Sequence, residues 1–244
     1  MATILAINPN TTAAVTALVE RSLREASPGV AWRMATGSFG ARYIVSEAAY
    51  AIASHAALDA WARHGEGCEA VLLACFGDPG LFALREQSAA PVVGLAEASM
   101  RAAAREATRF SIVTGGPRWR PMLERLAASL GFGAGLASVR TIEITGAQAA
   151  ADPHNAILGL AQACREARQQ DGAGAVILGG AGFAGLGTRV ADAAGMAVID
   201  SVVAGARAAA ELARGGPWPY SREAGTKPMP ATGIDAELAD RLYD

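Results

Sequence analysis

Short apolar runs alternate along this chain with longer segments in which apolar residues recur at helical spacing. Runs such as Ala70–Ala74 and Ala175–Leu178 show no polar alternation, which is typical of strands buried on both faces of a parallel sheet. The predicted strands are Thr3–Ile7, Ala31–Ala35, Ala70–Ala74, Pro91–Gly94, Arg109–Thr114, Ser138–Glu143, Ala175–Leu178 and Ala197–Ile199. The predicted helices are Thr12–Glu25, Val45–His64, Gly80–Gln87, Ala96–Ala107, Arg120–Leu130, His154–Gln170, Gly185–Ala194, Val202–Arg214 and Asp235–Tyr243. Strands that alternate with helices in this way predict an α/β fold.

The chain also resembles itself at a separation of about 105 residues. Glu69–Leu81 reads EAVLLACFGDPGL and Gly174–Leu186 reads GAVILGGAGFAGL, with six of thirteen positions identical. The run RAAA recurs after 106 residues, and the same separation sets the strand that ends at Ile7 against the strand that ends at Val113. Three matches in register and in order indicate two similar halves.

The repeat predicts two parallel-sheet α/β domains related by pseudo-twofold symmetry. Residues 1–96 together with 201–244 are expected to form the half with the Cys75 loop, and residues 97–200 the half with the Gly180 loop. Because α/β sheets bind ligands at the carboxyl ends of their strands, we expect a ligand cleft between the two halves.

Composition narrows the classes of function. Of 244 residues, 52% are hydrophobic and 18% charged, and the net charge of −2 gives no general attraction to nucleic acid or an anionic membrane. The only lysine is Lys227 and no Gly-Lys-Ser/Thr sequence occurs, which argues against a pyridoxal phosphate enzyme and a phosphate-binding loop. The scattered histidines predict no metal site. Three cysteines without a recognisable secretion signal predict reduced thiols in the cytoplasm.

Cys75 is the first candidate for chemistry. It ends an apolar strand and precedes a glycine-containing loop, Phe76–Gly80, that leads into a helix. The free N–H groups of a helix start are expected to lower the pKa of such a thiol, so that its thiolate can act as a base. The alternative is a buried cysteine that packs as a small hydrophobic residue, and position alone leaves both interpretations open. Asp78 is either a second acid or base or, more simply, a turn residue before a proline.

Two other loops offer polar groups for a carboxylate or a ring carbonyl. Asn10 and Thr11 follow the first strand at a helix start, and Thr114 ends the fifth strand. For the first of these loops the alternative is an ordinary turn with Thr11 or Thr12 as the helix cap, just as Asp152 is expected to cap a later helix.

The loop Gly180–Gly185 reads GAGFAG and matches the dinucleotide-binding pattern G-x-G-x-x-G. It follows a strand and precedes a helix, and Asp200 stands 20 residues after its first glycine, so a nicotinamide-dependent dehydrogenase is one alternative. The matching loop of the first half carries Cys75 and Asp78 instead, and no separate substrate domain follows, which weakens that alternative.

Four motifs together resemble the Asp/Glu/hydantoin racemase superfamily, and hydantoin and allantoin racemases most of all. They are NPNTT at 8–12, ACFGDPGL at 74–81, FSIVT at 110–114 and VILGGAG at 176–182. The resemblance implies two similar α/β domains, no cofactor, and two cysteines on opposite faces of the substrate. One cysteine removes the proton alpha to a carbonyl and the other returns it. Cys75 matches the first of these cysteines.

The second cysteine of the family pattern falls on Gly180, in Gly179–Gly182, which reads GGAG where the family has GCAG. Glycine cannot carry a proton, and the loss of one acid–base group is expected to cost about 10²–10⁴-fold in rate. Another side chain or a water replaces the thiol, or the enzyme performs one-sided chemistry, or the chain is an engineered or inactive form. One-sided chemistry would resemble that of arylmalonate decarboxylase, whose single catalytic cysteine matches position 180.

We therefore predict a cofactor-independent racemase-type isomerase for a hydantoin, allantoin or amino-acid-like substrate, with Cys75 as the proton carrier and Gly180 opposite it. Asn10, Thr11 and Thr114 are expected to bind the carboxylate or ring carbonyls. Negative charge that develops on the substrate is expected to be stabilised by the backbone N–H groups of Phe76, Gly77, Ala181 and Gly182. The alternatives, in order, are a single-cysteine decarboxylase, a ligand-binding protein without turnover, and a dehydrogenase. The expected partner is a small molecule, not nucleic acid or a membrane, and the resemblance implies a homo-oligomer.

Overall fold

The computed structural model describes residues 1–144, 146–217 and 232–242, in which the chain forms two four-stranded sheets. The first sheet has the order β2-β1-β3-β4 and the second β6-β5-β7-β8. The strands are β1 (Thr3–Asn8), β2 (Ala31–Thr36), β3 (Ala70–Leu73), β4 (Val92–Gly94), β5 (Phe110–Gly115), β6 (Leu136–Ile142), β7 (Ala175–Leu178) and β8 (Ile199–Asp200). Every pairing within these sheets is parallel, which confirms the predicted α/β class.

Helices cover the sheets and connect the strands, as expected for parallel strands. They are α1 (Ala13–Ala26), α2 (Glu47–His64), α3 (Leu81–Gln87), α4 (Leu95–Glu106), α5 (Trp119–Ser129), α6 (Gly146–Ala151), α7 (Pro153–Gln170), α8 (Gly187–Ala194), α9 (Ser201–Ala213) and α10 (Ala236–Leu242), with a 3₁₀ turn η1 at Ala181–Phe183. The sequence pattern missed α6 and η1. Lys227, and Tyr243 at the end of the last predicted helix, lie outside the described residues.

The strand register reproduces the sequence repeat. Ile7 of β1 pairs with Leu73 of β3, and Val113 of β5 pairs with Leu178 of β7. The two pairs occupy equivalent places in the two sheets. Ile7 and Val113 are 106 residues apart and Leu73 and Leu178 are 105 apart, which are the separations that the sequence repeat shows. The central strands therefore end in the same way in both halves, and each half places its loops at an equivalent edge.

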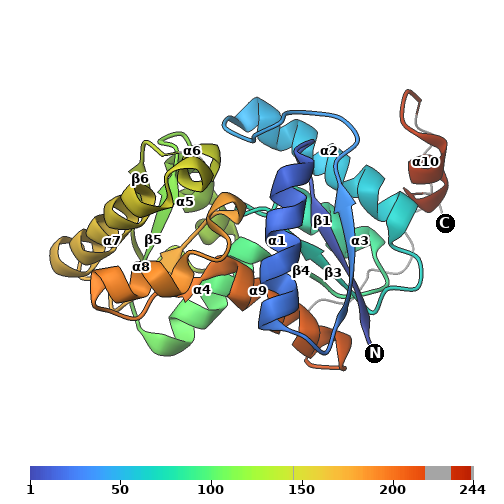
Figure 1. Cartoon of the computed structure of the whole chain (residues 1–244). Coiled ribbons are helices and arrows are strands. Elements are labelled where there is room, and N and C mark those ends of the chain that lie inside the picture. The colour runs from blue at the N-terminus through green and yellow to red at the C-terminus, as the bar shows by residue number, and fades with distance from the viewer. Residues whose placement is uncertain (145, 218–231, 243–244) are drawn as a thin grey trace.

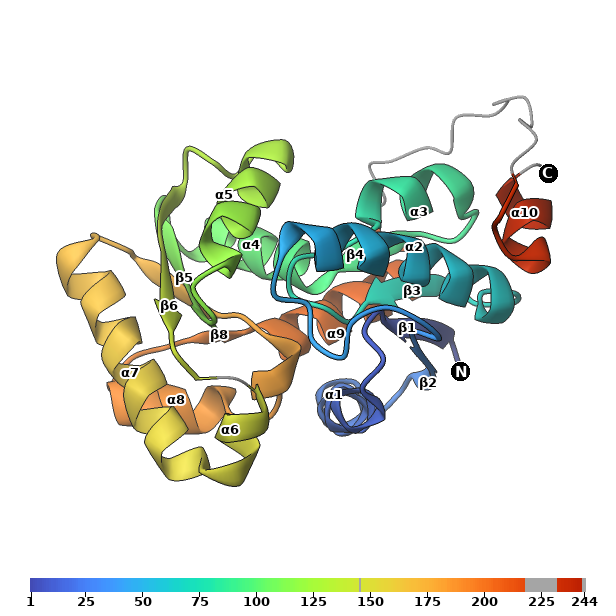
Figure 2. The same cartoon turned by 90° about the horizontal axis from the view of Figure 1, so that it is seen from above.

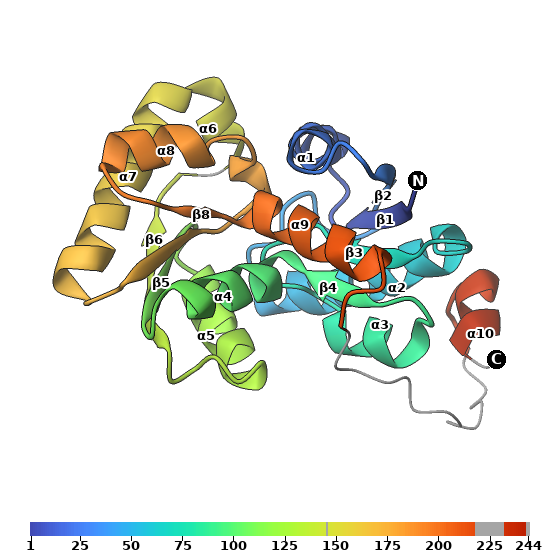
Figure 3. The same cartoon turned by 90° about the horizontal axis from the view of Figure 1, so that it is seen from below.

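The two sheets form two lobes with α4 and α9 between them (Figure 1 and, from above, Figure 2). The chain passes from the first sheet to the second through α4 and returns through α9, and these helices pack side by side (Figure 3). Neighbouring residues of β1 enter different cores: Ile4 joins the core under α4 and α9, whereas Leu5 packs toward α2. This burial of both faces explains why the strands show no polar alternation.

The helix caps follow the sequence only in part. Asp152 caps α7 as predicted, because its side chain accepts the N–H of Asn155. Thr12 stands at the cap position of α1 but its hydroxyl donates to the carbonyl of Arg42 at 2.6 Å instead, so the side chain does not cap the helix. Among the described residues, no helix has the length and apolarity needed to cross a membrane.

Candidate active site

A cavity of about 150 Å³ lies at the carboxyl ends of β1, β3, β5 and β7, between the two lobes. Most of the predicted site residues line it. The first half contributes Asn10, Cys75 and Phe76, and the second contributes Thr114, Gly180, Ala181 and Gly182. Thr11 and Gly77 do not line the cavity, and the backbone N–H of Thr11 donates to the carbonyl of Ala41.

A larger cavity of about 690 Å³ lies between α4, α8 and α9. None of the predicted site residues lines it, and its walls in the described residues contain no cysteine. The smaller cavity, where the loops of the two halves meet, is therefore the candidate active site.

Aromatic rings from each half pack on glycines of the other half at this site. The ring of Phe76 lies so close to Gly179 that a Cβ there would be 2.2 Å from the Cε1 atom. Trp119, at the start of α5, lies against Gly77 in the same way, and a Cβ would be 2.4 Å from its Cζ3 atom. Gly77 is thus needed for the packing of the two loops, which the sequence did not predict.

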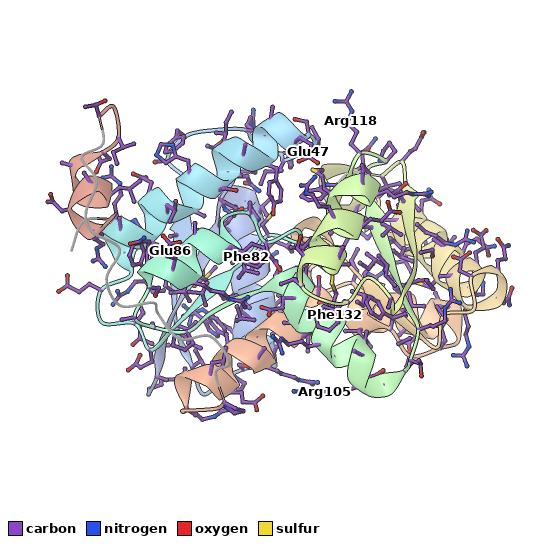
Figure 4. All side chains as sticks on the ribbon, turned by 180° about the vertical axis from the view of Figure 1, so that it is seen from behind. Glu47, Phe82, Glu86, Arg105, Arg118 and Phe132 are labelled. Atoms are coloured by element: carbon purple, nitrogen blue, oxygen red, sulfur yellow. The ribbon has the colours of Figure 1, made fainter. Side chains whose placement is uncertain are left out.

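The Cys75 loop is also held from α2 and α5. The hydroxyl of Tyr50 donates to the carbonyl of Gly77 at 2.9 Å. The guanidinium of Arg125 lies 5.9 Å from the centre of the Tyr50 ring and forms an ion pair with Glu47, with Nη2 and Oε2 3.0 Å apart. Figure 4 shows Glu47 at the upper rim where the lobes meet. Arg118 is exposed and points away from the molecule in the same view.

Cys75 is 7% exposed and packs against Ile44 and Ala53 while lining the cavity. Burial raises the pKa of its thiol, and the nearby Asp78 raises it further. The expected lowering of this pKa by a helix start is therefore wrong, because α3 begins only at Leu81 and desolvation dominates. The resting group is a neutral thiol that can donate a proton.

Asp78 is the turn residue before a proline that the simpler interpretation predicts, because its N–H donates to the carbonyl of Cys75 at 3.0 Å and its own carbonyl accepts the N–H of Leu81 at 3.1 Å. It is buried with a φ of 52°, and its carboxylate accepts the N–H groups of Ala96 at 2.9 Å and Glu97 at 2.8 Å. It caps α4 from a distant loop, and it does not line the cavity. Burial raises the pKa of this carboxyl to about 7, although the two backbone donors oppose the shift.

In the part of the chain that the structure describes, no thiol lines the wall opposite Cys75. Gly180 has a φ of 134°, and a Cβ there would lie 3.0 Å from Cδ2 of Phe183 and 3.7 Å from Oγ1 of Thr114. Thr114 is 4% exposed, and its hydroxyl has no hydrogen bond to any residue that the structure describes. The polar group beside position 180 is therefore this hydroxyl.

Backbone donors are available on both walls. Across the described ranges, no hydrogen bond takes up the backbone N–H of Phe76, Gly77, Ala181 or Gly182. Unpaired N–H groups at a cavity between two loops suit an oxyanion or a carbonyl oxygen. Of these four residues, Phe76, Ala181 and Gly182 line the cavity.

Several apolar lining residues were missed or only suspected from the sequence. Arg42, Tyr43 and Trp119 are residues that the sequence allows either as pocket lining or as surface and packing residues. Tyr43 and Trp119 line the cavity, whereas Arg42 does not. Ile44, Ile144 and Phe183 also line it. Phe183 directly follows Gly182 in the loop that the sequence motifs already select, and this position is the signal that could have found it.

The G-x-G-x-x-G loop is not arranged as a dinucleotide fingerprint. Its residues Ala181–Phe183 form a 3₁₀ turn, and the following helix begins at Gly187 rather than at the predicted Gly185. The carboxylate of Asp200 accepts the N–H groups of Val202 at 2.9 Å and Val203 at 3.2 Å, which makes it the N-cap of α9. In the ranges that the structure covers, no group of three potential metal ligands occurs either.

The fold and the cavity agree with a comparison against known families. The Asp/Glu/hydantoin racemase model matches residues 4–209, so the chain belongs to this family and is an enzyme of the racemase class. It is similar to the hydantoin racemase of Pseudomonas sp. (strain NS671), with 36% identity over 206 residues, 84% of this chain and 83% of the relative.

Solved structures give the same result. The allantoin racemase from Klebsiella pneumoniae superposes with a TM-score of 0.85 and 31% identity, covering 95% of this chain and 97% of that one. Arylmalonate decarboxylase superposes with a TM-score of 0.60 and 23% identity, covering 88% and 94%, a likeness that shows the fold alone.

Proposed function

We propose that this chain moves a proton at a carbon alpha to a carbonyl of a hydantoin, allantoin or amino-acid-like substrate, without a cofactor. The observation that carries the proposal is the cavity between the two halves, where the thiol of Cys75 shares a small space with Gly180 and unpaired backbone donors. The similarity to hydantoin and allantoin racemases supports this choice of substrates.

In the proposed reaction the Cys75 thiolate takes the α-proton, and the C–H electron pair moves into the carbonyl to form an enolate. The backbone N–H groups of Phe76, Ala181 and Gly182 stabilise the enolate oxygen, which is usually the largest contribution to such catalysis. Asn10 and Thr114 bind the remaining carboxylate or carbonyl. The raised pKa of Cys75 makes the thiolate scarce but a stronger base, and it makes the conjugate thiol, which returns the proton, a weaker acid that is always present in its protonated form.

In the proposed reaction the second face of the substrate lies against position 180. Gly180 carries no proton, and the Thr114 hydroxyl is the polar group beside it. A hydroxyl can donate to an enolate but is a very weak base, so we expect slow racemisation compared with a two-thiol site.

One observation favours a second candidate, a one-sided decarboxylase. Among the described residues that line the cavity, only Cys75 carries a thiol, and burial keeps that thiol protonated. Loss of CO₂ from a malonate-type acid would leave its electron pair on the α-carbon as an enolate. The Cys75 thiol would then form the new C–H bond, and water would reprotonate the thiolate.

The variant Cys75→Ala tests the proposal. We expect the wild-type protein in D₂O to exchange the α-proton of a hydantoin, allantoin or aspartate for deuterium, which NMR measures. We also expect it to lower the optical rotation of the substrate, at a slower rate than that of the exchange. The variant is expected to lose about 10²–10⁴-fold in exchange rate. Cys164→Ala is the matched control, because Cys164 is buried in the core of the second half away from the cavity. Full activity in Cys75→Ala would remove this thiol from the mechanism.

The decarboxylase candidate is tested with the same two variants by CO₂ release from an α-aryl or α-alkyl malonate. Release that depends on Cys75, together with no exchange on hydantoins, would favour decarboxylation over racemisation. Ligand-induced thermal stabilisation with neither reaction would instead indicate a binding protein.

A further inference from the structure

The side-chain amide of Asn10 has a fixed orientation in the cavity. Its Oδ1 atom accepts the backbone N–H of Thr12 at 2.8 Å, and because a backbone N–H can only donate, the atom that faces it must be the oxygen. Asn10 is 7% exposed, and its Nδ2 atom has no hydrogen bond within the described residues. The amide therefore leaves its N–H donors for a ligand.

A second asparagine determines this orientation. Asn8, at the end of β1, is 0% exposed and does not line the cavity. Its Oδ1 accepts the backbone N–H of Asn10 at 3.3 Å, which fixes its own amide in turn. Its Nδ2 then donates to Oδ1 of Asn10 at 3.0 Å. Two backbone donors thus determine which atom of each side chain is the donor.

Hydroxyl groups complete the environment of Asn8. Its Nδ2 also donates to Oγ1 of Thr16 at 3.0 Å, and the hydroxyls of Thr16 and Thr36 lie 2.7 Å apart. Buried polar groups are normally paired in this way. None of these side chains titrates, so the direction of each hydrogen bond in the network is the same at any working pH.

We propose that Asn8 is a positioning residue that presents the Asn10 amide N–H donors to the cavity. The inference rests on the proposed function and extends it. The substrate must place an oxygen acceptor, a carboxylate or a ring carbonyl, against Asn10, and a ligand with a donor at that place is rejected. Asn8 touches no substrate and acts only through its neighbour.

The variant Asn8→Asp tests this role. When ionised, the new carboxylate puts an oxygen against Oδ1 of Asn10, while the Thr12 N–H still requires an oxygen at that place. Repulsion between the two side-chain oxygens therefore displaces the Asn10 amide from the position in which its N–H donors face the cavity. At pH 8 we expect KM for a hydantoin substrate of the wild type to rise about tenfold or more, with kcat changed much less. When protonated at lower pH, the side chain can again donate to Asn10, and the ratio of variant KM to wild-type KM should fall. A merely structural defect would not recover in this way.

Two further variants serve as controls. Thr16→Val removes another hydrogen bond of Asn8 but leaves the bond to Asn10 intact, so KM should stay within about threefold of wild type. Asn10→Ala removes the donor itself, so KM should rise as in Asn8→Asp but without recovery at low pH. Equal KM for Asn8→Asp and wild type at pH 8 would overturn the proposal.

Binding separates this inference from the proposed function. Calorimetric titration with hydantoin and with malonate measures affinity without turnover, and Asn8→Asp should weaken whichever probe the wild type binds. If the wild type turns over no hydantoin, the proposed function fails while this difference in affinity still supports the role of Asn8. A crystal structure of the wild type needs no ligand: Oδ1 of Asn10 directed at the cavity would overturn the inference, and Oδ1 bound to the Thr12 N–H would support it.

Discussion

Replacing Asp78 with asparagine changes the charge next to Cys75 without changing the size of the side chain. Asp78 is fully enclosed, and burial raises the pKa of its carboxyl from 3.8 to about 7. In the unfolded chain the carboxyl ionises near 3.8, whereas in the folded protein it holds its proton to about 7. The group therefore contributes stability that is fully present below pH 3.8 and is lost as the pH rises through about 7.

The size of this effect follows from the two pKa values. Each pKa unit corresponds to about 1.4 kcal/mol, so the whole shift is worth about 4 kcal/mol. Between pH 5 and pH 8 the shift covers about two units, or about 3 kcal/mol. Asp78→Asn has no proton to lose but leaves one of the N–H groups of Ala96 and Glu97 without an acceptor, which costs about 1–3 kcal/mol at every pH.

We expect the wild type to be more stable than Asp78→Asn at pH 5 and this advantage to shrink by about 3 kcal/mol by pH 8. Urea unfolding followed by tryptophan fluorescence at several pH values measures the difference. Asp152→Asn is the matched control, because Asp152 caps α7 on the surface and its pKa is lowered by hydrogen bonds from Asn155. That carboxyl is ionised throughout this window, so its difference from wild type should not vary. A constant difference for Asp78→Asn would refute the assignment of a raised pKa.

Two other variants test the loops of the cavity. Gly180→Cys is expected to lower Tm by several degrees, because φ at 180 is 134° and such strain costs about 1–3 kcal/mol. Gly180→Cys should also raise the rate of racemisation, whereas the control Gly180→Ala should lower Tm without raising that rate. Equal rates of racemisation in the two variants would show that a second thiol is not what the site lacks. Tyr50→Phe removes the hydrogen bond to the Gly77 carbonyl and should cost about 1 kcal/mol in urea unfolding. No loss in that variant would mean that Tyr50 does not hold the Cys75 loop.

The sequence predicts the sheets of this protein well because strand burial leaves a simple signal. The runs around Ala70 and Ala175 are apolar throughout, and both became central strands of parallel sheets. Helix α6 escaped prediction because its sequence, GAQAAA, is too short to show helical periodicity. The turn η1 escaped because GAGFAG matches a helix-opening pattern, yet Gly180 adopts a φ of 134° and the ring of Phe183 packs beside it.

The candidate site is predicted in its polar members but not in its apolar wall. Asn10, Cys75 and Thr114 follow directly from motifs at strand ends, because parallel strands bring these ends to one edge. Ile44 and Ile144 come from loops without a motif, so only the folded chain places them at the cavity. The pKa of Cys75 was predicted with the wrong sign, since the sequence shows the helix after it but not the burial around it.

The two halves keep the same backbone at the cavity while their side chains differ. Gly80 and Gly185, which are 105 residues apart, both have positive φ, 86° and 80°, so the turn after each central strand is retained. At equivalent places before these glycines, Cys75 stands against Gly180. A symmetric cleft with two thiols would treat both faces of a planar enolate alike. This cleft has a thiol on one wall and a glycine beside a hydroxyl on the other, so in the proposed reaction the new proton should arrive mainly from the Cys75 side. The sign of the optical rotation generated from a prochiral substrate would therefore report which wall carries the chemistry.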